Sequence, residues 1–471
     1  MKEGVVAIVG PQSSSAASFA AHIGRATKVP FVSFGATDPN LSEMQYPYFI
    51  RVVPSDVLQM DAIASFVANY GWKEVAMFHM DDDYGTNGAS SLSDSLQARS
   101  MKLVEKVPIS PWMDTSSIEQ ILEQLMNQQT RVFVLHAHPD VGLAILQEAY
   151  NLNMMGYGYV WIATDQITIS LEDTPLPPGV VRNTQGIIGI RPYIPPSLKL
   201  QRFFNSWNKN FPTHFDEPDQ INPYALYAYD AIWTISYALS SYLKTNGKIN
   251  FISPRKMPNQ SGGKSELSKM KIFEAGEVFK DEILRTRFLG TSGLIKFDKN
   301  GDLIGGAFEY VNMVGRNPHG VGYWWPNYNR VSLSPPSEHE LLNLTNIPQN
   351  PGFLYQGSSS NVTKMPIIWP GGLTNTPRGW ALPKNGNPLI IGVPRKAGYT
   401  ELVGVTMDTQ NQTVIDGFCI QVFKAALDLV PYDVPYKFEL LGDGITTPKY
   451  SDLIQKLANQ VLIVIIYAIL F

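Results

Sequence analysis

A chain of 471 residues is longer than one ordinary domain, and its 44% hydrophobic and 17% charged residues are typical of a globular protein, so two or three compact units are expected. Its net charge of −4, without any block of Lys or Arg, excludes the positive surface that nucleic-acid binding requires. The single cysteine, Cys419, excludes an internal disulfide framework and a zinc site built from several thiolates.

The chain begins with a strand–helix–strand pattern. An apolar run at residues 5–9, a helical pattern at 16–27 and a second apolar run at 31–34 follow one another, and small or hydroxyl-bearing residues end both strands, at 10–15 and 35–39. This order predicts one right-handed βαβ unit whose strand ends share the carboxyl edge of a parallel sheet, where open α/β sheets bind ligands. Serines at a helix N-terminus cap the helix or hold a carboxylate together with free backbone N–H groups, and both interpretations stay open.

Strands and helices continue to alternate, which predicts parallel, doubly wound sheets. Two such lobes with a cleft between them would suit the length. The last helix of this region has apolar residues on nearly all sides and is expected to be largely buried. The expected strands lie at residues 48–54, 75–79, 103–109, 131–136, 159–163 and 185–193, and the expected helices at 56–70, 86–99, 116–127, 140–151, 197–208 and 224–244.

Residues 298–302 (DKNGD) have the composition of a hairpin turn between expected strands at 294–297 and 306–311. Their alternating acidic and amide side chains also resemble part of a calcium loop. The rest of that loop and its closing glutamate are missing, so a metal site is not expected.

The composition changes after residue 333. Residues 334–387 are rich in Pro, Gly, Ser and Asn, which predicts a linker behind a first domain at 1–333. Trp369 and Trp380 are expected to pin parts of this linker to a neighbouring surface.

A new α/β pattern follows at residues 388–460, with expected strands at 389–393 and 437–441. The final run, VLIVIIYAILF at 461–471, is too short to cross a bilayer, which takes about 20 residues. It is expected to be a buried strand, or foreign sequence from a misread splice junction.

The common catalytic motifs are missing from this sequence: it contains no G-x-S-x-G elbow, H-E-x-x-H pair, Walker loop or G-x-G-x-x-G fingerprint. His136 and His138 end a strand without partner ligands, which favours a structural role over a metal site. Residues 81–83 (DDD) favour a solvated acidic loop over a cation site. Since no nucleophile, base and oxyanion site assemble, neither an enzyme nor a cofactor is expected.

What these strand ends can form is a receptor for an amino acid. A zwitterion needs donors for its carboxylate and an acceptor for its ammonium group. The serines before the first helix and the loop after the second strand are the expected donors, an aspartate across the cleft is the expected acceptor, and a tyrosine is expected to pack on the ligand. The residues assigned to this site are Ser14, Ser15, Gly35, Ala36, Thr37, Tyr84 and Asp165.

Several segments resemble the amino-terminal domain of plant glutamate receptor-like channels. They are GPQSS, VPFVSFGATDP, FIRVVPSDVLQ, YGWKEVAMFHMDDDYGTNG and YVWIATD, and further on YALYAYDAIW, VGYW, IIWPGG, TPRGW, LIIGVP, GFCIQVFKAAL and LLGDG. The match runs from Gly4 to about Asn459. The resemblance implies a two-lobed, periplasmic-binding-protein-like clamshell, a linker, and the first segment of an agonist-binding domain.

The same resemblance implies a function. The parent protein would be an amino-acid-gated, non-selective cation channel that passes calcium, in the plasma membrane with this part on the extracellular side. Its subunits would form homo- or hetero-tetramers that the amino-terminal domain helps to assemble. Arg395, Lys396 and Ala397 sit where the family's first ligand-facing loop of the agonist site begins. Two alternatives stay open: a soluble amino-acid-binding protein, and an assembly module whose cleft is empty.

Features at the chain ends suggest a partial sequence. The family begins with a signal peptide and an additional strand and helix, and it continues beyond residue 460 with an agonist-binding arginine and pore helices, so this chain is expected to be truncated at both ends or to come from an incomplete gene model. Contact with a membrane is expected only through segments not present here. Predicted glycosylation sites, which favour an extracellular location, are Asn40, Asn259, Asn343, Asn361 and Asn411.

Overall fold

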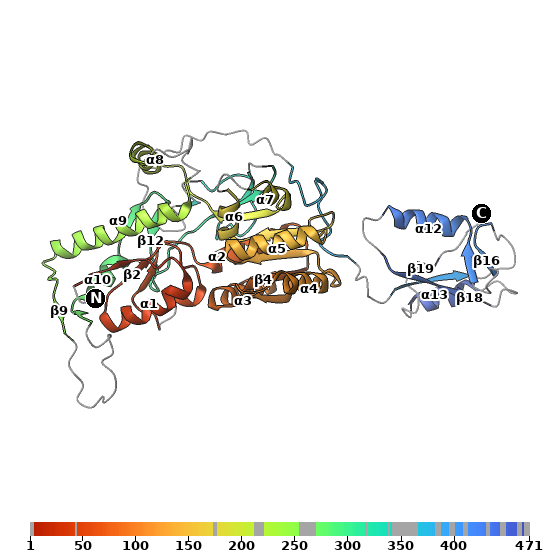
Figure 1. The fold of residues 1–471 in the computed structure, drawn as a ribbon, viewed down its shortest axis with the longest axis horizontal. Helices are drawn as coiled ribbons and strands as arrows, with labels where there is room; N and C mark the ends of the chain where they lie inside the picture. The colour runs from red at the N-terminus through yellow and green to blue at the C-terminus, as the bar shows by residue number, and fades with distance from the viewer. Residues whose placement is uncertain are drawn as a thin grey trace, which may run out of the picture. The chain divides into compact units, whose positions relative to one another are not determined.

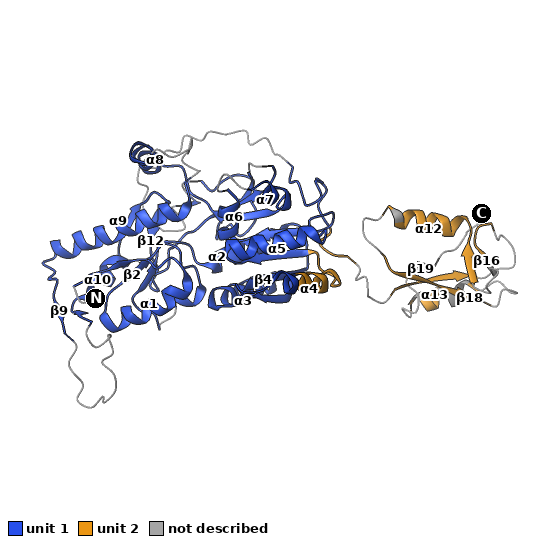
Figure 2. Ribbon diagram, in the orientation of Figure 1, with its two compact units in different colours: residues 1–118, 132–377 blue, residues 119–131, 378–471 orange. Residues whose placement is uncertain are grey.

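The computed structural model divides into two compact units. Unit 1 comprises residues 1–118 and 132–377, and unit 2 comprises 119–131 and 378–471 (Figure 2). The structure describes residues 4–42, 45–172, 177–211, 221–253, 270–315, 318–326, 328–337, 340–341, 366–381, 388–394, 401–407, 413–429, 434–442, 449–458 and 464–465.

The first lobe of unit 1 is built on a parallel, three-stranded sheet in the order β1-β2-β3. The predicted βαβ unit is its start: β1 (Ile8–Val9), α1 (Ser14–Thr27) and β2 (Phe31–Ser33). Helices from much later in the chain complete this lobe, and Tyr227 and Phe279 pack against Val32 in its core (Figure 1). The other elements of the lobe are η1 (Pro39–Ser42), β3 (Phe49–Arg51), α8 (Leu198–Asn210), α9 (Pro223–Lys244), β9 (Phe251–Ile252), β10 (Ile272–Phe273), α10 (Gly276–Leu284), β11 (Arg287–Leu289) and β12 (Leu294–Lys296).

The second lobe contains a seven-stranded sheet in the order β14-β13-β8-β7-β6-β4-β5, parallel from β8 to β5. Side chains alternate between its faces: Val134 packs in the core shared with α2 and α3, while Phe133 packs on the opposite face with its ring tilted against that of Trp161. The elements are α2 (Asp56–Asn69), β4 (Glu74–Met80), α3 (Asp83–Gln97), β5 (Lys102–Ile109), α4 (Thr115–Met126), β6 (Val132–His136), α5 (Pro139–Asn151), β7 (Val160–Ala163), α6 (Asp165–Glu172), α7 (Pro178–Asn183), β8 (Ile188–Pro192), β13 (Phe308–Asn312) and β14 (His319–Trp324). The predicted two-lobed clamshell with parallel sheets is confirmed.

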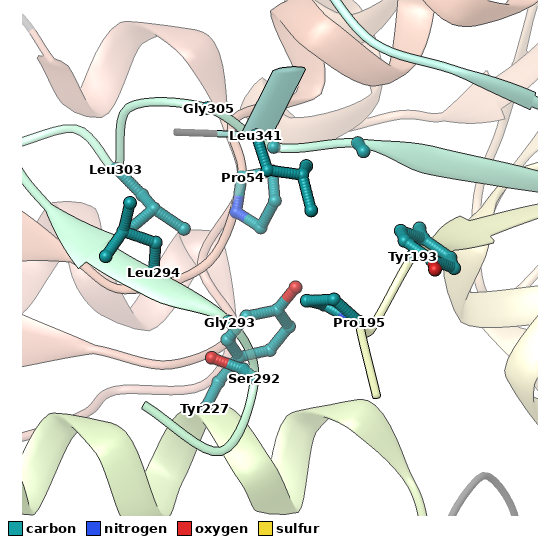
Figure 3. Close-up of a pocket in the computed structure, with 12 residues that line it drawn as sticks. Pro54, Tyr193, Pro195, Tyr227, Ser292, Gly293, Leu294, Leu303, Gly305 and Leu341 are labelled. Carbon is teal, nitrogen blue, oxygen red and sulfur yellow. The ribbon is translucent and has the colours of Figure 1, made fainter. Parts of the chain in front are cut away.

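Three connections join the two lobes: between β3 and α2, between β8 and α8, and between β12 and β13. Residues from all three surround a small cavity of about 30 Å³, among them Pro54, Pro195 and Leu303 (Figure 3). Such a volume holds about one water molecule. This cavity at the hinge is therefore too small for an amino acid.

The turn predicted at residues 298–302 is present. The Asp298 carboxylate accepts hydrogen bonds from the N–H groups of Asn300 and Asp302, and Phe297 bridges Leu303. The prediction that the strand after the turn completes a hairpin is wrong, because the chain crosses to the second lobe and β13 pairs with β8 and β14. The Asp302 carboxylate instead accepts a 2.6 Å bond from Nε of the buried Arg51.

Helix α9 differs from its prediction as well. One face is buried, including Leu226, Tyr227 and Ala231, but Ile232 and Tyr237 on the opposite face are 54% and 44% exposed. The expectation of a largely buried helix is wrong, because the lobe covers only one side of it and apolar residues continue onto the solvent side.

Unit 2 contains a parallel sheet in the order β18-β15-β19 and a small antiparallel ladder. Ile391, Val393 and Ile420 form the buried part of its core. The described part of the terminal apolar run is the short strand β19, paired with β15. The boundary between the units divides α4, whose residues 119–126 fall in unit 2. The other elements of unit 2 are β15 (Leu389–Pro394), β16 (Gly404–Met407), β17 (Thr413–Asp416), α12 (Phe418–Asp428), β18 (Tyr436–Leu441), α13 (Tyr450–Ala458) and β19 (Val464–Ile465).

Within the described ranges, no helix combines the length and the apolar composition that a membrane crossing needs. The same ranges contain no cluster of three or more His, Cys, Asp or Glu side chains suited to a metal ion.

Candidate functional site

A cavity of about 470 Å³ lies between the two lobes of unit 1. The first lobe contributes the loop and first turn of α1, Gly35 after β2, and Tyr224 at the start of α9; the second lobe contributes the starts of α3 and α5 and one side of α6. The volume falls in the range of small-molecule sites. Apart from the side of α6, the walls come from helix N-termini and loops, as expected for the carboxyl edge of α/β sheets.

The sequence left open whether the serines before α1 cap the helix or face a ligand, and the structure shows both arrangements. Ser13 is the N-cap of α1, and its hydroxyl accepts a 3.3 Å bond from the N–H of Ala16. Ser14 and Ser15 both line the cavity. The Ser14 hydroxyl accepts from the N–H of Asp38 at 3.2 Å, which leaves its own proton for another acceptor, and Ser15 donates across the cavity to Asp82 at 3.3 Å.

The loop after β2 is only partly turned toward the cavity. Gly35 lines it, and a Cβ at this position would lie 2.9 Å from the carbonyl oxygen of Gln12, so the close approach of the two loops requires glycine. Ala36 is buried and its N–H donates to the Ser33 hydroxyl at 3.0 Å. The Thr37 hydroxyl donates to the Asp56 carboxylate at 2.8 Å. Ala36 and Thr37 thus lie behind the described lining of the cavity.

Asp165 also lies behind this lining. It is 2% exposed, and its carboxylate accepts bonds from the Tyr224 hydroxyl at 2.7 Å and from the Gln59 amide at 3.2 Å. Tyr224 itself lines the cavity. The Tyr224 bond joins the two lobes, and it places the Asp165 charge next to the cavity wall.

A buried polar network therefore connects the predicted residues with others that the sequence analysis missed. The Gln59 amide donates to both Asp165 and Asp56, and Asp56 also accepts from Thr37. His136 lies 3.9 Å from Asp56 through Nε2, and this atom has no hydrogen-bond partner among the described residues. Asp56 could have been found as a site residue from its position between a strand end and an apolar helix. The same kind of position identified the serines before α1.

Burial controls the protonation of this network. It raises the pKa of Asp56 to about 6, although the bonds from Thr37 and Gln59 act in the opposite direction. It raises the pKa of Asp165, with a further contribution from the Asp56 charge. It lowers the pKa of His136 to about 4, so the imidazole is neutral near pH 7.

Tyr84 links the network to the cavity. It is 2% exposed and lines the cavity, its ring lies parallel to that of His138 at 5.8 Å, and its hydroxyl lies 3.2 Å from Nδ1 of His136. The structure therefore brings Ser14, Ser15, Gly35 and Tyr84 together around one cavity, with the remaining predicted residues of this site directly behind it.

Some predicted residues fall elsewhere. Asn40 lies in the short helix η1. Its side chain is exposed and therefore accessible to a glycan. The other four sequons and the predicted agonist-segment residues lie outside the described residues; they are Asn259, Asn343, Asn361, Asn411, Arg395, Lys396 and Ala397.

A family model described as the receptor family ligand binding region matches residues 1–316, which contain the whole cavity lining, the first lobe and the second lobe up to β13. The chain belongs to this family. The family is one of receptors, and the resemblance to plant glutamate receptors noted in the sequence is confirmed by the relatives of this chain.

Those relatives match almost the whole chain. It is 36% identical over 466 residues to glutamate receptor 3.1 of Oryza sativa subsp. japonica, covering 98% of this chain and 48% of the relative. It is 37% identical over 457 residues to glutamate receptor 3.4 of Arabidopsis thaliana, covering 97% and 46%, and 32% identical over 441 residues to glutamate receptor 2.1 of the same plant, covering 93% and 46%. The chain spans about half the length of the curated relatives it matches.

Proposed function

We propose that unit 1 binds a free amino acid in the cavity between its lobes, as the ligand-binding part of a glutamate receptor-like protein. The observation that carries this proposal is the arrangement of the cavity, in which the first turn of α1 and Ser14 face Tyr84 and Tyr224. The names of the plant relatives support an amino acid as the ligand class.

The ligand's carboxylate would lie at the N-terminus of α1. The first-turn N–H groups of a helix have no intrahelical acceptor, and the helix dipole favours a negative charge there. The Ser14 hydroxyl proton adds a donor. The ammonium group would face the acidic side of the cavity, where Asp165 lies behind Tyr224.

For the whole protein we propose an amino-acid-gated, non-selective cation channel that passes calcium. Residues 1–333 would be its extracellular amino-terminal domain, 334–387 a linker, 388–460 the first segment of the agonist-binding domain, with Arg395, Lys396 and Ala397 at its ligand-facing loop, and 461–471 a divergent tail. Related subunits would assemble into a tetramer in the plasma membrane. The identity of the relatives over nearly the whole chain supports this assignment.

Replacing Ser14 with alanine is expected to weaken amino-acid binding about tenfold or more, because a hydrogen bond to a charged group is lost. Isothermal titration calorimetry of the purified chain with the twenty common amino acids measures this. Ser18→Ala is the matched control: Ser18 lies on the same helix, contacts Tyr46 at 3.3 Å and does not line the cavity.

The outcome separates the proposed function from its alternatives. Equal affinities of the wild type and Ser14→Ala would contradict the assigned pose. If no amino acid releases heat, the cavity is not an amino-acid site and the assembly-module alternative takes its place. A soluble amino-acid-binding protein would bind the ligand but show no self-association in analytical ultracentrifugation.

A further inference from the structure

Resting on the proposed function, we infer that the cavity of unit 1 accepts amino acids with neutral side chains and discriminates against glutamate and aspartate, and that Asp82 is the residue that sets this preference. The inference concerns the second charge of the ligand. A dicarboxylic amino acid brings one carboxylate for the α1 N-terminus and another that needs a partner of its own.

The described lining offers that second carboxylate no cation. It contains neither Lys nor Arg, and its one carboxylate is that of Asp82. The remaining polar lining consists of hydroxyls, amides and His138, whose Nδ1 donates to the Gln166 side-chain oxygen at 3.1 Å. A carboxylate moved from water into such a site loses hydration without gaining an ion pair.

Asp82 is held in place facing the cavity. One of its carboxylate oxygens caps α3 by accepting from the N–H of Gly85 at 2.9 Å, and the other accepts from Ser15 across the cavity at 3.3 Å. Both bonds fix the negative charge between the two lobes. A ligand ammonium group would be attracted to it and a second carboxylate repelled.

The buried layer behind the cavity lining also contains acidic side chains. Burial is the largest cause that raises the pKa of Tyr84, and the carboxylates of Asp56, Asp165 and Asp82 raise it further, in that order. Burial and Asp165 likewise raise the pKa of Tyr224. Both tyrosines line the cavity. The carboxyl groups of Asp56 and Asp165 therefore lie directly behind the tyrosines of the cavity wall.

Arg51, whose charge acts on Asp56, is already paired with other groups. Arg51 is fully buried, and its guanidinium donates to the Asp302 carboxylate, to the carbonyl oxygen of Asp38 and to Ser42. It does not line the cavity. Its guanidinium is therefore not part of the wall that a bound glutamate would contact.

Calorimetry on the full chain at pH 7.5 tests the inference with the twenty common amino acids as probes. The tightest ligands are expected to carry neutral side chains and to bind about tenfold or more tighter than glutamate and aspartate. In Asp82→Asn this gap is expected to shrink to about threefold or less, since the charge is removed while asparagine still caps the helix. Asp83→Asn, which removes an exposed neighbouring charge outside the lining, is expected to leave the gap unchanged.

The results distinguish failure of the inference from failure of the proposed function. Glutamate or aspartate among the tightest ligands of the wild type would overturn the inference and leave amino-acid binding intact. A gap that persists in Asp82→Asn would overturn the role of Asp82. An absence of heat from all twenty amino acids would overturn the proposed function, and the inference with it.

Discussion

Replacing Trp369 with alanine is expected to lower the free energy of unfolding of unit 1 by about 3–5 kcal/mol, the usual cost of truncating a buried tryptophan. Trp369 is 2% exposed and belongs to the core of the second lobe. Its ring meets those of Tyr70 and Trp72 edge to face, at centroid distances of 5.2 and 5.7 Å. An alanine leaves a cavity that these rigid rings cannot fill.

Urea unfolding followed by tryptophan fluorescence and circular dichroism measures the change. Trp112→Ala is the matched control, because Trp112 is 90% exposed and its loss is expected to change stability by no more than about 0.5 kcal/mol. If both variants unfold at the wild-type urea concentration, Trp369 does not contribute to the core.

Trp369 also shows where composition stops predicting structure. Residues 334–387 have the composition of a linker, and Trp369 was expected only to pin part of it to a surface. Residues 366–377 belong to unit 1, and the backbone of Ile368 exchanges hydrogen bonds with the side chain of Asn312 on β13. Turn-forming residues determine local conformation, but whether such a segment packs on a sheet depends on a surface formed by distant residues.

The regular alternation of strands and helices was predictable because each element carries its own signal. Buried parallel strands such as β6 read as continuous apolar runs, and α1 and α2 begin at serine caps. Helix α6 was missed because its sequence, DQITISLE, is rich in β-branched residues that favour strands. It is helical since Ile167 and Leu171 are buried there, which is a tertiary effect.

The candidate site was predictable to the extent that local motifs mark it. Ser14, Ser15, Gly35 and Tyr84 all follow predicted strand ends, and they do meet at one cavity. The network behind them was not predictable, because Asp56 and His136 are separated by a long stretch of sequence and approach only after α2 packs beside β6. Side-chain direction was not predictable either: Thr37 points toward Asp56, away from the described lining.

Asp56 and His136 are expected to make the stability of unit 1 depend on pH in opposite directions. Asp56 has a raised pKa of about 6 in the folded state, so its contribution is present below its unfolded value of 3.8 and is lost as the pH rises through 6. His136 has a lowered pKa of about 4, so its contribution is present above its unfolded value of 6.5 and is lost as the pH falls through 4.

Each of these shifts corresponds to about 3 kcal/mol, and the two contributions oppose each other between pH 4 and 6. Asp56→Asn is expected to remove one of them, so that stability rises by about 3 kcal/mol between pH 4 and 6.5. His136→Asn is expected to do the reverse, with stability falling by about 3 kcal/mol between pH 4 and 6. Urea unfolding at half-unit steps of pH measures both slopes.

The double variant Asp56→Asn/His136→Asn is the control for this pair, because the opposing contributions disappear together and the pH profile should return to the flatter wild-type form. Burial and the Asp56 charge also raise the pKa of Asp165, so Asp165 contributes a slope of the same sign as that of Asp56, which remains in the His136 variant and is reduced in both variants that lack Asp56. Single variants that both keep the wild-type profile would show that the two groups titrate in the folded chain as they do in water. Opposite slopes, by contrast, require both groups to be desolvated in the folded chain, where Asp56 is fully buried and accepts the bond from Thr37.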